Sequence, residues 1–126
     1  MEDGALTVEV RSERGVTIAA VTGDIDISTV TRLRERLFEL ADSGRTLIVD
    51  LNRVTFIDSA GLGALVGAAR RAAAQGSSLH AVCARPQTRK LLWLTGVDRR
   101  IPLTATVDGA LMLLAASRDA PPADSS

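Results

Sequence analysis

The chain has 126 residues, of which 46% are hydrophobic, 24% charged and 2% aromatic, which fits one soluble domain with a core of mainly Leu, Val, Ile and Ala. Fifteen basic residues balance fifteen acidic ones, so the net charge is zero and the basic excess typical of a nucleic-acid-binding protein is missing. A single cysteine, Cys83, excludes an internal disulfide framework and a cysteine-based metal cluster. The N-terminus shows no charged-then-apolar leader, and no apolar run approaches the ~18 residues of a membrane span. We therefore expect a cytoplasmic protein without a metal centre that binds neither nucleic acid nor a membrane.

The first third of the chain predicts a β-hairpin followed by a helix. Residues 6–10 alternate apolar with polar positions, and residues 16–21 form a second β-rich run beyond a polar turn. A turn or short strand end at residues 23–26 follows, and Ser28 or Thr29 can cap the next helix. That helix places its apolar positions on one face and its charged positions elsewhere, on a solvated side. The apolar positions are Val30, Leu33, Leu37, Leu40 and Ala41, and the charged ones are Arg32, Glu35, Arg36 and Glu39.

The remaining two thirds alternate strand with helix. Residues 46–51 are nearly all apolar and predict a strand covered on both faces, with residues 52–55 as a short connection. A last strand at residues 101–103 should lie at a sheet edge, because Pro102 cannot donate a ladder hydrogen bond. Residues 117–126 are small, polar and proline-containing, and predict a disordered tail behind a domain of residues 1–116. The other expected elements are a helix over about 59–74, a strand over 78–82, a helix from Pro86 to the glycine at 96, and a last helix marked by Val107, Ala110, Leu111 and Leu114.

This order predicts an α/β fold. A hairpin followed by alternating helices and strands gives a mixed sheet of four to five strands with about four helices and right-handed crossover connections. The sequence contains no internal repeat and no linker, so a single domain is expected.

The segment at residues 56–63, Phe-Ile-Asp-Ser-Ala-Gly-Leu-Gly, is the centre of the chain. Asp58 and Ser59 are small polar residues of the type that opens a helix. The positions i+4 and i+8 from Ser59 are Gly63 and Gly67, so a hydroxyl stands at the start of a column without side chains. Each interior glycine costs about 1 kcal/mol relative to alanine. The two glycines therefore predict that another group packs closely against the backbone of this helix.

Residues that could carry catalysis or hold a ligand are few. His80 is the only histidine and is expected as a partly buried strand residue, while Cys83 at the end of the same strand is expected in the core. Trp93 lies among leucines and is expected to pack rather than to form a ligand platform. No Ser-His-acid pattern stands out, so no catalytic residue is assigned.

The glycines allow a second interpretation, as a dinucleotide-binding turn. Gly61, Gly63 and Gly67 follow a strand in the form G-x-G-x-x-x-G, which is a weak signal. The charge of Asp58 would oppose a pyrophosphate, and no acidic residue ends the following strand to bind a ribose. No Lys-Ser/Thr pair follows the glycines, so a P-loop is absent as well.

The Asp-Ser-Ala-Gly-Leu-Gly string within residues 56–63 resembles the phosphorylation segment of the anti-sigma factor antagonists, bacterial members of the STAS domain family. Three weaker likenesses accompany it: Gly-Asp-Ile-Asp at residues 23–26, the strand at 47–51 and the helix with a glycine turn at 91–97. The resemblance covers roughly residues 6–114. It implies a single STAS-like domain in which helices and strands wind as a β-α superhelix.

The resemblance also implies a non-enzymatic switch that uses no cofactor. A partner anti-sigma factor, which is also a serine kinase, would phosphorylate Ser59; the unmodified chain would bind that kinase and free its sigma factor, and a phosphatase would reverse the modification. Asp58 would steer the hydroxyl or cap the helix, and Asp26 is expected near Ser59 because strand-end loops gather at one sheet edge. The expected partner-binding surface consists of Asp26, Asp58, Ser59, Ala60, Gly61, Gly63 and Gly67.

Two further expectations concern charge. A phosphate on Ser59 adds about −1.5 to −2 charges at pH 7 and should be tolerated at a helix N-terminus, where the dipole and free backbone N–H groups favour anions. Its effect is therefore expected at the interface rather than on the fold. Arg70 and Arg71 could form a rim contact, although a solvated role is favoured.

Other functions stay open. The alternative is a STAS-like module that binds a small ligand or nucleotide, with Ser59 as a passive helix cap, and a weaker third possibility is a dinucleotide enzyme. The sequence names neither the kinase nor the sigma factor, the signal or the oligomeric state.

Overall fold

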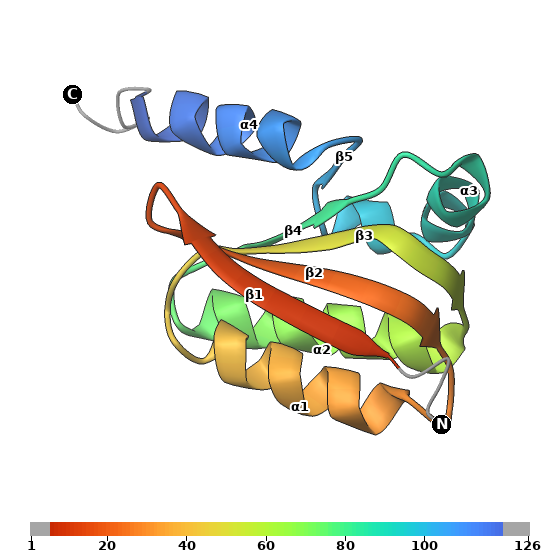
Figure 1. Ribbon diagram of the computed structural model, residues 1–126. Coiled ribbons are helices and arrows are strands. Elements are labelled where there is room, and N and C mark those ends of the chain that lie inside the picture. The colour runs from red at the N-terminus through yellow and green to blue at the C-terminus, as the bar shows by residue number, and fades with distance from the viewer. Residues whose placement is uncertain (1–5, 120–126) are drawn as a thin grey trace.

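The computed structural model describes residues 6–119, with side chains as far as Ala116, and shows a five-stranded sheet with helices on both faces (Figure 1). The strands lie in the order β1-β2-β3-β4-β5; β1 and β2 are antiparallel and the other neighbours are parallel. The expected α/β fold with a mixed sheet is confirmed. The strands are β1 (Thr7–Glu13), β2 (Val16–Ile25), β3 (Leu47–Ile57), β4 (Leu79–Val82) and β5 (Leu103–Thr104); the helices are α1 (Val30–Ala41), α2 (Ser59–Ala74), α3 (Pro86–Leu94), the 3-10 helix η1 (Val97–Arg99) and α4 (Val107–Asp119).

The sheet has a core on each face. Helices α1 and α2 cover one face, and α4 lies over the other (Figure 1). Along β3, Leu47 and Val49 belong to the larger cluster beneath α1 and α2, while Ile48 between them belongs to the cluster with Leu111 of α4. Alternate strand residues point to opposite faces, so a strand buried on both sides must be apolar throughout. The expectation of a doubly covered strand is confirmed.

Strand boundaries differ from the expected ones around the central segment. Residues 52–55, expected as a connection, continue β3 to Ile57. Of the two alternatives expected for residues 23–26, a turn or a strand end, the strand end is confirmed, since β2 continues to Ile25. The two extensions pair with each other, and register shifts between Ala20 and Thr22 and between Gly23 and Asp24 accommodate them. Polar residues are tolerated in these extensions because the outer faces reach solvent. The structure thereby carries both strands as far as the start of α2.

The C-terminal part shows smaller differences. The last strand is a sheet edge, as expected, but lies at Leu103–Thr104, and Pro102 contributes its carbonyl to the Ala81 N–H at 2.9 Å. Helix α4 extends to Asp119, so the first three residues of the expected tail are helical, and residues 120–126 lie outside the described part. Trp93 is 64% exposed, so the expectation that it packs among leucines is wrong. Cys83 is fully buried, as expected.

Three glycines of α2 have three different environments. A Cβ on Gly61 would lie 2.4 Å from Ile25 Cγ2 and 2.8 Å from Ile57 Cγ1, far inside contact distance. Glycine at this position therefore lets the first turn of α2 pack directly on the ends of β2 and β3. A Cβ on Gly67 would lie 2.9 Å from Cζ of Phe38 on α1, whereas one on Gly63 would meet nothing within 4 Å.

Helices α1 and α2 are joined along one flank. The Phe38 ring lies over Gly67, and the Arg71 guanidinium lies over that ring, 4.7 Å from its centroid. Arg71 also forms a two-point ion pair with Asp42, with Nε–Oδ1 at 3.0 Å and Nη2–Oδ2 at 2.6 Å, and this hydrogen bonding lowers the pKa of Asp42. Arg71 is therefore part of the fold, and the expectation of a merely solvated or rim arginine is wrong for it.

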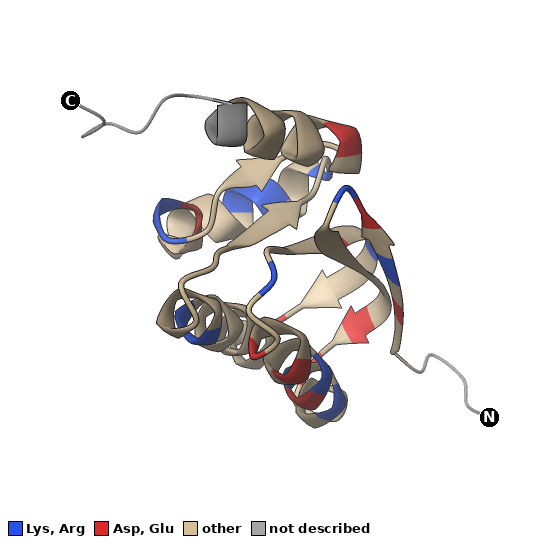
Figure 2. Ribbon diagram, turned by 90° about the vertical axis from the view of Figure 1, so that its left-hand side faces the viewer, with Lys and Arg blue, Asp and Glu red and all other residues tan. Residues whose placement is uncertain are grey.

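Charge is spread widely over the molecule. Figure 2 shows positive and negative residues interspersed along α1, where Arg36 pairs with Glu39 at 2.8 Å. Within residues 6–119, no group of three or more His, Cys, Asp and Glu residues could hold a metal ion. None of the described helices is both long and apolar enough to cross a membrane.

We predict opposite effects of alanine at two of these glycines. Gly61→Ala should destabilise the protein by about 1–3 kcal/mol, because its methyl group overlaps Ile25 and Ile57 in a packed core. Gly63→Ala should stabilise it by up to about 1 kcal/mol, because helix propensity improves and the site is open. Urea unfolding of both variants measures the difference, and equal effects would contradict the packing described.

We predict that His80 makes stability fall in weak acid. Burial lowers the pKa of His80, whose Nδ1 is buried without a hydrogen-bond partner among the described residues. As the pH falls below ~6.5, the unfolded chain takes up a proton that the native chain resists, so stability present above this pH is lost, by at most about 1.4 kcal/mol per pH unit. Urea unfolding between about pH 7.5 and 5.5 measures the loss, and His80→Gln should flatten the curve there. Parallel curves for the two proteins would contradict this role.

Candidate functional site

The site is built at the start of α2, where β3 passes directly into the helix. Asp58 is the N-cap residue, with extended backbone angles of φ −108° and ψ −173°. Its Oδ1 accepts hydrogen bonds from the N–H groups of Ala60 at 3.0 Å and Gly61 at 3.2 Å. Its own N–H donates to the Ile25 carbonyl at 3.1 Å, which ties the cap to the end of β2. The cap is thus held by the sheet on one side and by the helix on the other.

Ser59 is the first residue of α2 and is exposed to solvent. Its hydroxyl makes no hydrogen bond to any residue of the described part. The capping role that the sequence left open between Asp58 and Ser59 therefore belongs to Asp58, and Ser59 as a passive helix cap is wrong. A hydroxyl with no structural task is available to a modifying enzyme.

Asp26 lies at the same edge of the sheet as Ser59, since it follows Ile25, whose carbonyl binds the Asp58 N–H. Its carboxylate organises the turn before α1: Oδ1 accepts from the Ser28 N–H at 2.9 Å, the Ser28 hydroxyl at 2.6 Å and the Thr29 N–H at 3.2 Å. The Ser28 hydroxyl is the main cause of the lowered pKa of Asp26. Its immediate role is to shape the loop beside the site.

Two exposed apolar residues at this edge of the sheet were missed by the sequence reasoning. Ile27, in the loop beside the site, is 79% exposed, and Phe56 near the end of β3 is 53% exposed. A signal for Phe56 existed, because strand alternation places it on the opposite side from the buried Ile57. Large exposed apolar side chains next to a modifiable hydroxyl are the type of anchor that protein interfaces use.

The other residues expected to bind a partner differ in accessibility. Gly63 is exposed and open, as expected of a docking position, and Ala60 is half-buried. Gly61, also expected to bind a partner, is buried against the strands, and the side of the half-buried Gly67 where a Cβ would stand faces Phe38, so the column expected to be bare at Gly63 and Gly67 is open at Gly63 only. Both are glycine for reasons of internal packing.

The electrostatics of the edge are acidic. Asp24, Asp26 and Asp58 lie at the ends of β2 and β3, and none of them forms an ion pair within the described part of the chain. Asp24 accepts a hydrogen bond from the Thr55 hydroxyl. The N–H groups of Ala60 and Gly61 are already bound by Asp58, so the expectation that a phosphate on Ser59 meets free helix amides is wrong for these two groups. These two N–H groups are therefore not available to a phosphate on Ser59.

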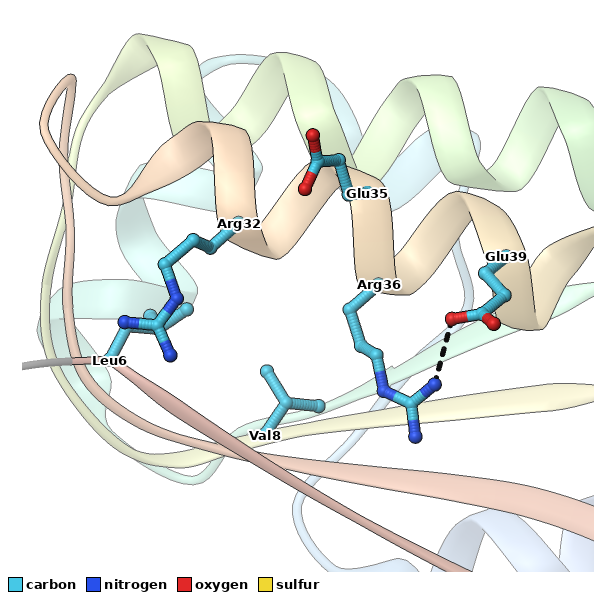
Figure 3. A pocket seen from close by; sticks show the side chains of 6 residues that line it. All are labelled: Leu6, Val8, Arg32, Glu35, Arg36 and Glu39. Atoms are coloured by element: carbon cyan, nitrogen blue, oxygen red, sulfur yellow. Dashed lines mark hydrogen bonds and ion pairs between the residues drawn. The ribbon is translucent and has the colours of Figure 1, made fainter.

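A separate hollow lies between β1 and α1 (Figure 3). Its volume is about 370 Å³, and Leu6 and Val8 line it together with Arg32, Arg36 and two glutamates of α1. In Figure 3 the two arginines extend from α1 toward β1, and Arg36 bonds Glu39 at 2.8 Å. The hollow contains none of the site residues, and its two arginines are balanced by two glutamates, one of which is paired with Arg36.

Sequence comparison identifies the family to which this chain belongs. Residues 7–110 match the family model described as the STAS domain. The chain is 30% identical over 106 residues to the anti-sigma-B factor antagonist of Bacillus subtilis, an alignment that covers 84% of this chain and 97% of that protein.

Comparison with solved structures gives the same result. An anti-sigma factor antagonist from Mycobacterium paratuberculosis superposes with a TM-score of 0.81 at 30% identity, covering 94% of this chain and 98% of that one. The fold is also that of the antagonist SpoIIAA in its unphosphorylated form (TM-score 0.71, 20% identity, 87% and 97% covered) and of Bacillus SpoIIAA in the phosphorylated form (0.66, 22%, 86% and 99%). Because the match spans most of the chain in both sequence and fold, this protein belongs to the STAS domain family, among its anti-sigma factor antagonists.

Proposed function

We propose that this chain regulates a sigma factor by partner switching. Unphosphorylated, it binds an anti-sigma factor that is also a serine kinase, and the sigma factor held by that kinase is released. The kinase then phosphorylates Ser59, which ends the binding, and a phosphatase restores the first state. Anti-sigma factor antagonists are non-enzymatic regulators, and the proposal places this one in the cytoplasm, where sigma factors act.

The observation that carries the proposal is the division of tasks between two neighbouring residues. Asp58 caps α2, and the Ser59 hydroxyl beside it is exposed and has no hydrogen bond within the described part. Modification of Ser59 therefore removes no contact on which the fold depends. SpoIIAA, which has the same fold, has been described in a phosphorylated form, which supports phosphorylation as the means of control proposed for this chain.

The mechanism is electrostatic exclusion at the interface. Ile27 and Phe56 at the same sheet edge, and Gly63 one turn along α2, offer apolar or bare surface on which a partner can pack closely and expel water. A dianion placed there lies next to the Asp58 carboxylate, and two of the helix amides that could neutralise it, those of Ala60 and Gly61, are occupied. Association must then bury an uncompensated charge, which costs several kcal/mol.

The alternatives lack comparable support. A nucleotide-binding module needs a site for phosphate, but the edge around Ser59 is acidic, and the hollow beside α1 has no net positive charge because two glutamates balance its two arginines. The passive-cap version fails because Asp58 is the cap. Tight binding of ATP or GTP to the isolated chain, without modification, would revive the first alternative.

We predict phosphorylation at Ser59 and nowhere else. The chain is incubated with ATP and each anti-sigma serine kinase of its source organism, and mass spectrometry locates the modified residue. Wild type should gain one phosphate, and Ser59→Ala should gain none. The proposal would be refuted if the Ser59→Ala variant were phosphorylated at another residue. It would also be refuted if none of the kinases phosphorylated the wild-type chain.

We predict that charge at Ser59 controls affinity. Ser59→Ala should bind the kinase as tightly as wild type within about threefold, whereas Ser59→Asp should bind at least ~100-fold more weakly, since about 1.4 kcal/mol corresponds to a factor of ten. Isothermal titration calorimetry measures both. Ser59→Asn adds a side chain of similar size without charge and should lose much less affinity. Equal affinities of the Asp and Asn variants would mean that size rather than charge controls binding.

We predict that the bare position at Gly63 is needed by the partner and not by the fold. Gly63→Leu adds a side chain where a Cβ meets nothing within 4 Å, so the free energy of unfolding should be unchanged or slightly higher. Kinase binding should weaken about tenfold or more, because the leucine holds the partner away from α2. Ala116→Leu, on the exposed surface of α4, is the matched control and should bind normally. Unchanged affinity of Gly63→Leu would exclude this position from the interface.

A further inference from the structure

One flank of α2 carries exposed and half-exposed residues that the other helices do not cover completely, among them Gly63, Val66 and Arg70. On the other flank Phe38 and Arg71 join the helix to α1. On the open flank a hollow of about 260 Å³ lies between α2 and Arg100, the residue that follows η1. Its floor is apolar and its two charged residues are both arginines. The residues that line it are Val66, Ala69, Arg70, Ala73 and Arg100.

This hollow continues the surface around Ser59. Counting from Ser59, the exposed or half-exposed residues Gly63, Val66, Arg70 and Ala73 lie at i+4, i+7, i+11 and i+14, which is one stripe of a helix. Arg70 is eleven residues from Ser59, or about 16 Å along the axis at ~1.5 Å per residue. A partner segment that lies along α2 from Ser59 therefore reaches the hollow within three turns.

The two arginines have no partner in the described part of the chain. Arg70 and Arg100 are both exposed, and neither guanidinium group forms a hydrogen bond or ion pair within residues 6–119, in contrast to that of Arg71, which is held by Asp42. Two unpaired guanidinium groups above an apolar floor complement an amphipathic segment that carries a carboxylate. The acidic edge near Ser59 and the basic hollow give the stripe opposite charges at its two ends.

We propose that this hollow binds an acidic segment of the anti-sigma factor and thereby sets the register of that partner on α2. An apolar side chain of the segment packs on Val66 and Ala73, and a neighbouring Asp or Glu binds Arg70 and Arg100. The inference rests on the proposed function, since it assigns a second contact to the same partner. Because opposite charges at the two ends favour one orientation, the contact also selects among anti-sigma factors that share the Ser59 contact.

The test uses the anti-sigma factor that phosphorylates Ser59 in the screen above. Arg70→Gln and Arg100→Gln should each weaken binding about three- to tenfold, and the double Arg→Glu variant about 100-fold, with most of the charge-reversal effect on the association rate. Binding of the double Arg→Gln variant should depend less on salt than that of wild type. The control is Arg45→Glu with Arg53→Glu, which makes the same change of net charge at exposed positions outside α2 and should leave affinity within about twofold.

The outcomes separate the two proposals. Thermal unfolding of each variant establishes that the fold is intact before its affinity is compared. If wild type binds and Ser59→Asp does not, while the Arg70 and Arg100 variants bind like the control pair, the partner switch stands and the acidic contact is wrong. If both arginine pairs weaken binding equally, the effect is one of net charge and the hollow has no special part. If no anti-sigma factor binds the unmodified chain, both proposals fail together.

Discussion

The close packing of the first turn of α2 on the ends of β2 and β3 is the constraint on which the site depends. Gly61 lets this turn approach Ile25 and Ile57 to distances that no side chain would allow. The Asp58 N–H then binds the Ile25 carbonyl, and its carboxylate caps the helix. With the turn fixed in this way, the side chain of Ser59 is exposed to solvent. The exposed hydroxyl is thus a consequence of how its neighbours are buried.

The same constraint decides how a phosphate acts. A helix N-terminus ordinarily receives an anion well, because its amides and dipole are free. Here the Asp58 carboxylate already accepts hydrogen bonds from two of these amides, and Asp24 and Asp26 lie at the same edge. A phosphoserine would therefore remain a poorly compensated surface charge instead of being absorbed by the fold. Such a charge leaves the domain folded and changes only what can approach it, which suits a reversible signal.

The two flanks of α2 do different work. On one, Phe38 covers Gly67, and the pair of Arg71 with Asp42 holds α1 and α2 together. On the other, small residues and the unpaired Arg70 face solvent. A helix that must be anchored and also offer a binding face can do both only if the two are separated around its circumference. Some of the small residues of α2 pack against α1 and others lie on the exposed face. The amino-acid composition of the helix does not show which small residue has which role.

The sequence by itself determined the fold class, the doubly covered strand at residues 46–51 and the special character of residues 56–63, because apolar periodicity and helix-opening residues are local properties of the chain. It also identified the family through one contiguous string. Which neighbour each glycine packs against follows only from the tertiary structure. Gly61 faces the ends of two strands, and Gly67 faces a ring from another helix. These contacts join residues that are far apart in the chain. The exposure of Ile27 and Phe56 and the pairing of Arg71 were settled in the same way. A pattern along one element shows which face is apolar, but only the assembled layers show what lies against that face.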